Sequence, residues 1–67
     1  MDKVGVQKRM EDLHITVPML CKELGMHPST YYRKMKKNGD GFSALDLLIM
    51  KRVLQMDDKT AQSCLLS

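Results

Sequence analysis

Two prolines with a glycine between them, Pro18, Gly25 and Pro28, constrain the fold of this chain most strongly. Proline suits the first turn of a helix, because its missing N–H would have no partner there. Glycine readily adopts the left-handed conformation that ends many helices. The pattern therefore predicts a short helix over residues 17–24, a tight turn, and a second helix over residues 28–37.

The second of these helices is expected to have two different sides. Tyr31 and Met35 are four residues apart and share one face, which we expect to be buried. The other face collects polar and cationic side chains: Ser29, Tyr32, Arg33 and Lys36. This face is the candidate binding surface of the chain.

The excess positive charge is concentrated in the same helix. The formal net charge is +3 and the pI is about 9.0. Residues 27–37 carry +4 and no acid, whereas the remaining seven basic and eight acidic residues leave −1. A basic run on a capped amphipathic helix favours a polyanion, most naturally nucleic acid, as the partner. The four cations are Arg33, Lys34, Lys36 and Lys37.

A first helix is predicted over residues 3–12, with Asp2 as its cap and an apolar stripe for the core. Lys8 and Arg9 are expected on its outer side, exposed to solvent; the alternative is that they contact phosphate. The stripe consists of Val6, Met10 and Leu13.

A fourth helix is predicted over residues 44–55, after a loop rich in glycine at residues 38–41. Ser43 and Asp46 have the spacing of a capping box, which marks its start. Residues 59–66 can form a last helix capped by Asp57 and Asp58, or an extended arm.

The fourth helix and the C-terminal segment hold more apolar residues than one face can bury in a domain of 67 residues. We expect the surplus to contact a second copy of the chain, since oligomers of one chain are usually symmetric. The predicted dimer residues are Leu48, Ile49, Val53, Met56, Leu65 and Leu66.

Other classes of function have little support in the sequence. Cys21 and Cys64 lack metal-site or redox spacing and are expected to be reduced residues of a core or interface. His14 and His27 stand in no recognisable catalytic constellation. No apolar run reaches the length of a signal peptide or a membrane span. We therefore expect a cytoplasmic protein without catalytic residues, metal or cofactor.

Residues 16–35 taken together closely resemble the helix-turn-helix of the phage repressor and Cro-like family. Cys21 occupies the small-residue position of the first motif helix, Leu24 and Gly25 close it, and Pro28 follows at the start of the recognition helix. The resemblance extends over nearly the whole chain, especially to small regulators of phages and prophages of Gram-positive bacteria. It departs at Val17, where many members carry a glutamine that positions a phosphate.

The resemblance implies an all-α, compact four- to five-helix fold of the lambda-repressor type, whose recognition helix enters the DNA major groove. Arg33 can pair with guanine through two hydrogen bonds. His27 either contacts DNA or only caps the helix. The expected base contacts are His27, Ser29, Tyr32 and Arg33. The expected backbone contacts are Thr16, Val17, Lys22, Thr30, Lys34, Lys36, Lys37 and Asn38.

The expected function is therefore a transcriptional regulator that binds double-stranded operator DNA as a homodimer at the nucleoid of a bacterial host cell, with no small-molecule ligand and no membrane. The small size favours a Cro-like or accessory role. The alternative is a protein-interaction module, such as an anti-repressor or host-factor binder, that uses the apolar face of the fourth helix.

Overall fold

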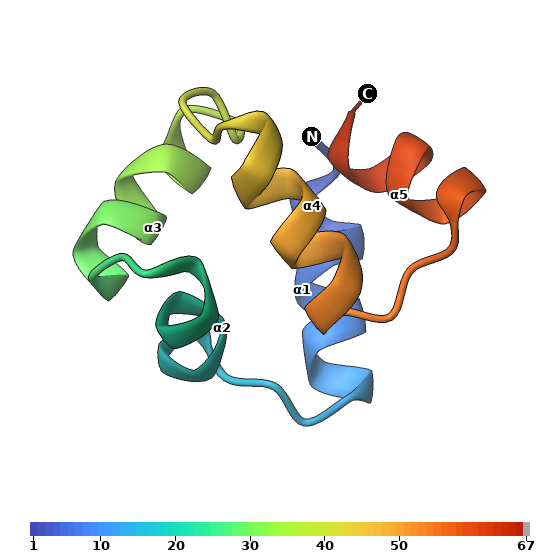
Figure 1. Cartoon of the computed structure of the whole chain (residues 1–67), viewed down its shortest axis with the longest axis horizontal. Coiled ribbons are helices and arrows are strands. Elements are labelled where there is room, and N and C mark those ends of the chain that lie inside the picture. The colour runs from blue at the N-terminus through green and yellow to red at the C-terminus, as the bar shows by residue number, and fades with distance from the viewer. Residues whose placement is uncertain (67) are drawn as a thin grey trace.

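Five helices and no strand make up the part of the chain that the computed structural model describes, residues 1–66 (Figure 1). This confirms the expected all-α class. The C-terminal segment is a helix and not an extended arm. The helices are α1 (Lys3–Asp12), α2 (Val17–Leu24), α3 (Pro28–Lys36), α4 (Ala44–Val53) and α5 (Asp58–Leu65).

A side chain caps the start of each helix, because the first backbone N–H groups have no partner within the helix. The carboxylate of Asp2 accepts from the Gly5 N–H at 2.9 Å. Ser43 and Asp46 form the expected capping box of α4, with both hydrogen bonds present. The full set of caps is Asp2, Thr16, His27, Ser43 and Asp57.

The first four helices end in the same way, with one residue in the left-handed conformation. After α2 this residue is Gly25, at φ 68°, and the N–H of Met26 donates to the Cys21 carbonyl at 3.1 Å. These are features of the Schellman motif. The same turn stops α4 at Val53, two residues before the predicted end, because Gln55 has a φ of 53°. The left-handed residues that follow these four helices directly or after one residue are His14, Gly25, Asn38 and Gln55.

The helices form one compact unit around a shared core. α2 packs against α3 and α4, while α5 packs against α1 and α4. The radius of gyration is 10.6 Å, close to the ~11 Å expected for a folded chain of this length. Tyr31 is the one fully buried residue of α3. The core residues are Val6, Met10, Leu20, Cys21, Leu24, Tyr31, Met50, Leu54, Met56, Ala61 and Leu65.

Two contacts close α1 onto the C-terminal half. The Asp2 N–H donates to the Cys64 carbonyl at 2.7 Å, so that the start of α1 lies beside the end of α5, as Figure 1 shows. Arg9 donates from Nε to the Leu54 carbonyl at 2.8 Å and from a terminal nitrogen to the Gln55 carbonyl at 3.0 Å. The prediction of a solvated Arg9 was wrong, since its guanidinium instead caps the end of α4.

Candidate nucleic-acid interface

One side of α3 is fixed in the core by aromatic and apolar contacts. Tyr31 is 3% exposed, and its ring centroid lies 5.8 Å from that of Phe42. Met35, one turn further along, is partly buried against the same core. These contacts determine which flank of α3 faces outward.

The outward flank holds the polar side chains that the helical spacing assigned to it. Ser29, Arg33 and Lys36 are exposed, and Tyr32 is 58% exposed. The ring of Tyr32 packs edge-on against that of Tyr31, at 5.9 Å between centroids and an interplanar angle of 76°. Tyr32 is therefore held on a fixed base while most of its surface stays accessible.

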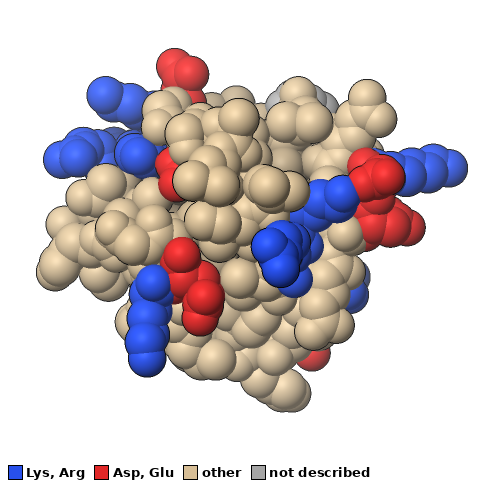
Figure 2. All heavy atoms as spheres, in the orientation of Figure 1, with Lys and Arg blue, Asp and Glu red and all other residues tan. Residues whose placement is uncertain are grey.

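Ion pairs among the described residues do not neutralise the positive charge of this flank. In Figure 2, lysine and arginine side chains gather at the upper left edge, towards the C-terminal end of α3 in Figure 1. Within residues 1–66, Arg33, Lys36 and Lys37 form no ion pair. Cations in the last turn of a helix also interact favourably with the negative end of its dipole, so these basic residues stabilise α3 as well.

His27 is the cap of α3. Its Nδ1 accepts a hydrogen bond from the Ser29 N–H at 3.1 Å and lies 2.9 Å from the Ser29 hydroxyl oxygen. A nitrogen that accepts from the backbone carries no proton, so the neutral ring holds its hydrogen on Nε2. His27 therefore caps α3, as expected, while a contact of its exposed side chain with DNA stays a prediction.

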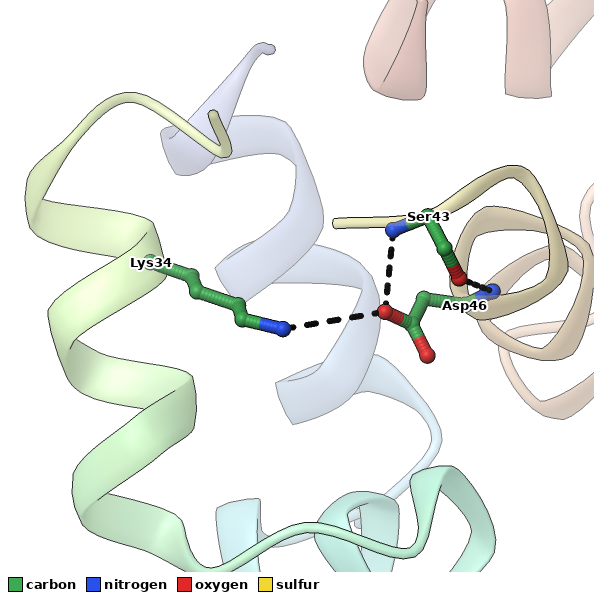
Figure 3. Close-up of polar contacts among 3 residues, drawn as sticks. All are labelled: Lys34, Ser43 and Asp46. Atoms are coloured by element: carbon green, nitrogen blue, oxygen red, sulfur yellow. Dashed lines mark hydrogen bonds and ion pairs between the residues drawn. The ribbon is translucent and has the colours of Figure 1, made fainter. Parts of the chain in front are cut away.

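Lys34 does not lie on the outward flank. Its ammonium is 3.9 Å from a carboxylate oxygen of Asp46 in α4 (Figure 3). It also lies 5.6 Å from the centre of the Phe42 ring. The same oxygen of Asp46 accepts from the Ser43 N–H at 2.9 Å, so Lys34 joins α3 to the cap of α4. Its predicted phosphate contact stays a prediction, and it would require the ammonium to leave Asp46.

The start of α2 offers few free backbone donors. Pro18 has no N–H, and the Met19 N–H donates to the Thr16 hydroxyl oxygen at 3.3 Å. Val17 therefore retains the only N–H without a partner among the first three residues of the helix, within the described residues. The Val17 side chain is partly buried against the core. Any phosphate bound at this helix start has one backbone donor.

The remaining predicted backbone contacts differ in exposure. Lys22, Lys37 and Asn38 are exposed, whereas Thr30 is half-buried. Asn38 occupies the left-handed position after α3, at φ 61°. Lys37 and Asn38 therefore adjoin the basic flank at its C-terminal end.

Sequence reasoning missed two residues beside this flank. A hollow between α1 and α3 brings Lys3 and Gln7 next to Tyr32 and Lys36, with Val17 in its lining. Nothing in the local sequence of residues 1–12 indicates this, since the contact depends on how α1 packs against the rest of the fold.

A second exposed surface lies between α4 and α5. Leu48 and Leu66 are 50% and 65% exposed and line an apolar groove with Leu47, as predicted for surplus apolar residues. Leu45, which was not predicted, is 64% exposed on α4. We call the groove and its rim the α4–α5 groove; it is lined by Ala44, Leu47, Leu48, Lys51, Ala61, Leu65 and Leu66.

Four of the six predicted dimer residues do not lie on the exposed surface where they were expected. Met56 is 7% and Leu65 is 5% exposed, so both are core residues, because the turn after α4 and the packing of α5 direct them inward. Leu65 forms part of the groove lining but has little free surface. Ile49 and Val53 are half-buried and line a different hollow with Glu23.

No group of His, Cys, Asp or Glu in residues 1–66 has an arrangement that could hold a metal ion. Cys21 and Cys64 are free thiols, and burial raises the pKa of Cys21 above its ordinary value.

Over residues 1–66, every helix is too short or too polar to cross a membrane.

Comparison of the chain with models of protein families, with curated proteins and with solved structures finds no match. The case for a function therefore depends on the geometry of α3 and its surroundings.

Proposed function

We propose that this chain is a sequence-specific DNA-binding transcriptional regulator. In this proposal α2, the turn at Gly25 and α3 act as a helix-turn-helix of the lambda-repressor-like type, and α3 is the helix that enters the major groove. The observation that carries the proposal is the outward flank of α3. Its cations have no partner within residues 1–66, although the same helix is fixed in the core by Tyr31.

Each side chain of the flank has a role that follows from its chemistry. Arg33 can donate two hydrogen bonds to one guanine, the commonest specific contact in the major groove. Ser29 and Tyr32 can hydrogen-bond to base edges, and the Tyr32 ring can contact a thymine methyl group. Lys36 and Lys37 contact phosphates, which fix the position of α3 without reading sequence.

We further propose that the chain binds DNA as a homodimer. A single small module buries only about 600 to 1,000 Å² on DNA, which limits its affinity. Two copies related by a two-fold axis read an inverted repeat with half-sites about 34 Å apart. Leu48 and Leu66 of the α4–α5 groove, together with the exposed Leu45 of α4, supply the apolar surface for that contact.

Selection of bound duplexes from a random pool tests the proposal directly. We expect a palindromic sequence to be recovered, and Arg33→Ala to lose binding to it in a gel-shift assay with an unchanged melting temperature. Lys8→Ala, which removes an exposed lysine of α1, serves as the matched control and should bind normally. Specific binding retained by Arg33→Ala, or no enriched sequence, would contradict the proposal.

The same leucines favour a second candidate, a protein-interaction module that binds a different protein through the α4–α5 groove. The two candidate functions predict different oligomeric states and different DNA binding in solution. A regulator should be a dimer that Leu48→Glu dissociates and should show affinity for DNA that falls with salt. An interaction module should be monomeric by sedimentation and show no salt-dependent DNA affinity.

A further inference from the structure

The hollow between α1 and α3 combines two cations with an apolar floor. Lys3 and Gln7 of α1 lie on one side and Tyr32 and Lys36 of α3 on the other. Val17, Tyr31 and Met35 complete the lining. Lys3 and Gln7 are four residues apart, so they share one flank of α1, about one turn from each other.

Neither cation of the hollow is engaged elsewhere. Lys3 and Lys36 are exposed and form no ion pair within the described part of the chain. Lys3 also stands in the first turn of α1, where the helix dipole disfavours a positive charge and no acid is present. A cation in a position that local helix stability disfavours is often explained by function.

The nearby acids do not neutralise the hollow. The carboxylate of Asp2 accepts from the Gly5 N–H, and Gly5 lies about 200° around the helix from Lys3 at ~100° per residue. Glu11 accepts from the Gln7 amide at 3.3 Å. Glu11 forms no ion pair with Lys3 or Lys36 within the described residues, and the Gln7 amide has a second N–H for another acceptor.

We propose that this hollow binds one sugar-phosphate unit of the DNA strand that flanks the groove entered by α3. The phosphate lies between the ammonium groups of Lys3 and Lys36, the deoxyribose packs on Val17 and Met35, and Gln7 donates to a phosphate or sugar oxygen. Because the hollow adjoins Tyr32, this contact fixes how far α3 turns about its own axis in the groove. The inference rests on the proposed function and adds α1 to the DNA-binding surface.

The salt dependence of affinity distinguishes this contact from a solvated lysine. The probe is the duplex recovered by selection, with binding measured by fluorescence anisotropy over a range of KCl concentrations. Lys3→Gln should reduce the slope of log K against log salt by about 0.9, the value for one lost phosphate contact. Lys8→Gln removes the same charge from an exposed residue of α1 that does not line this hollow, and it should leave the slope unchanged.

Neutral phosphate substitutions locate the contact. A single methylphosphonate is placed in turn at each position of both strands, and its effect is compared for wild type, Lys3→Gln and Lys36→Gln. At one position the methylphosphonate should weaken DNA binding by the wild type but have a much smaller effect on binding by both variants. A Lys3→Gln slope equal to that of wild type, or the absence of such a position, would overturn the inference while DNA binding by the wild type still supports the proposed function. Absence of DNA binding by the wild type would overturn both.

Discussion

The phenol hydroxyl of Tyr31 donates to the sulfur of Met10 across 3.7 Å inside the core. This contact joins α3 to α1 and leaves the phenol without water. Burial, with smaller contributions from the nearby Cys21 and Tyr32, raises the pKa of Tyr31 to about 12.

The raised pKa of Tyr31 predicts a loss of stability at high pH. A tyrosine in the unfolded chain ionises near pH ~10, so its contribution is fully present below pH ~10 and is lost as pH rises towards ~12. Tyr31→Phe should match wild type in urea unfolding at neutral pH, since a hydrogen bond to sulfur is weak, and should lose less stability at alkaline pH. Both proteins keep Cys21, so a parallel decline in the two would show that Tyr31 is not responsible.

Arg9 should contribute to stability through its two hydrogen bonds to the end of α4. Arg9→Ala leaves the carbonyls of Leu54 and Gln55 without this donor and should lower the free energy of unfolding by about 1.5 to 3 kcal/mol. Arg9→Lys cannot donate in the same forked geometry and should recover only part of the loss. Lys8→Ala provides the control. Equal stability of the Arg9 and Lys8 variants in chemical denaturation would contradict the capping role.

Gly25 and Gln55 occupy equivalent left-handed positions and should respond in opposite ways to substitution. Gly25→Ala should cost about 1 kcal/mol through backbone strain alone, since a methyl group there meets no atom within 4 Å. Gln55→Gly should raise the melting temperature, because glycine adopts a φ of 53° without strain. Thermal unfolding by circular dichroism checks both, and a destabilised Gln55→Gly would show that contacts of the glutamine outweigh its strain.

Asp57 should make the stability sensitive to acid. Hydrogen bonds from the side chain and N–H of Thr60 hold the pKa of Asp57 below its ordinary value. The contribution of the carboxylate is therefore present above pH ~4 and is lost as pH falls through the lowered pKa. Asp57→Asn keeps a capping oxygen, so it should resemble wild type at neutral pH and lose less stability below pH ~4. Identical acid unfolding curves would exclude this role.

Lys34 and Lys36 are two residues apart but should differ in DNA binding. Lys36→Gln should reduce the salt slope by about 0.9, whereas Lys34→Gln should leave it unchanged. The half-buried Lys34–Asp46 pair should contribute no more than about 1 kcal/mol to stability. If the two variants weaken DNA binding equally, Lys34 leaves Asp46 to contact phosphate.

The starts of the helices could be predicted because they depend on short-range chemistry. Asp2, Thr16, Ser43 and Asp57 each accept from an N–H three residues later, so spacing alone reveals them. The two faces of α3 follow from helical periodicity in the same way.

The corrections concern side chains whose partners are far away in the sequence. Arg9 is 45 residues from Leu54, and no local pattern indicates that they meet. Met56 and Leu65 were predicted to lie in a dimer interface. The sequence does not show whether an apolar residue is buried in its own core or against a second copy of the chain. The hollow that contains Lys3 depends on how α1 packs against the other helices. The spacing of residues in the sequence does not determine that packing.

The hydrogen bond between Asp2 and Cys64 has a consequence for synthesis of the protein. α5 closes the core against the first helix, so a growing chain cannot complete its hydrophobic interior until Leu65 has left the ribosome. A nascent polypeptide that has already exposed residues 28–37 would thus remain only loosely folded, and the outward flank of α3 would take its final position after α5 is in place.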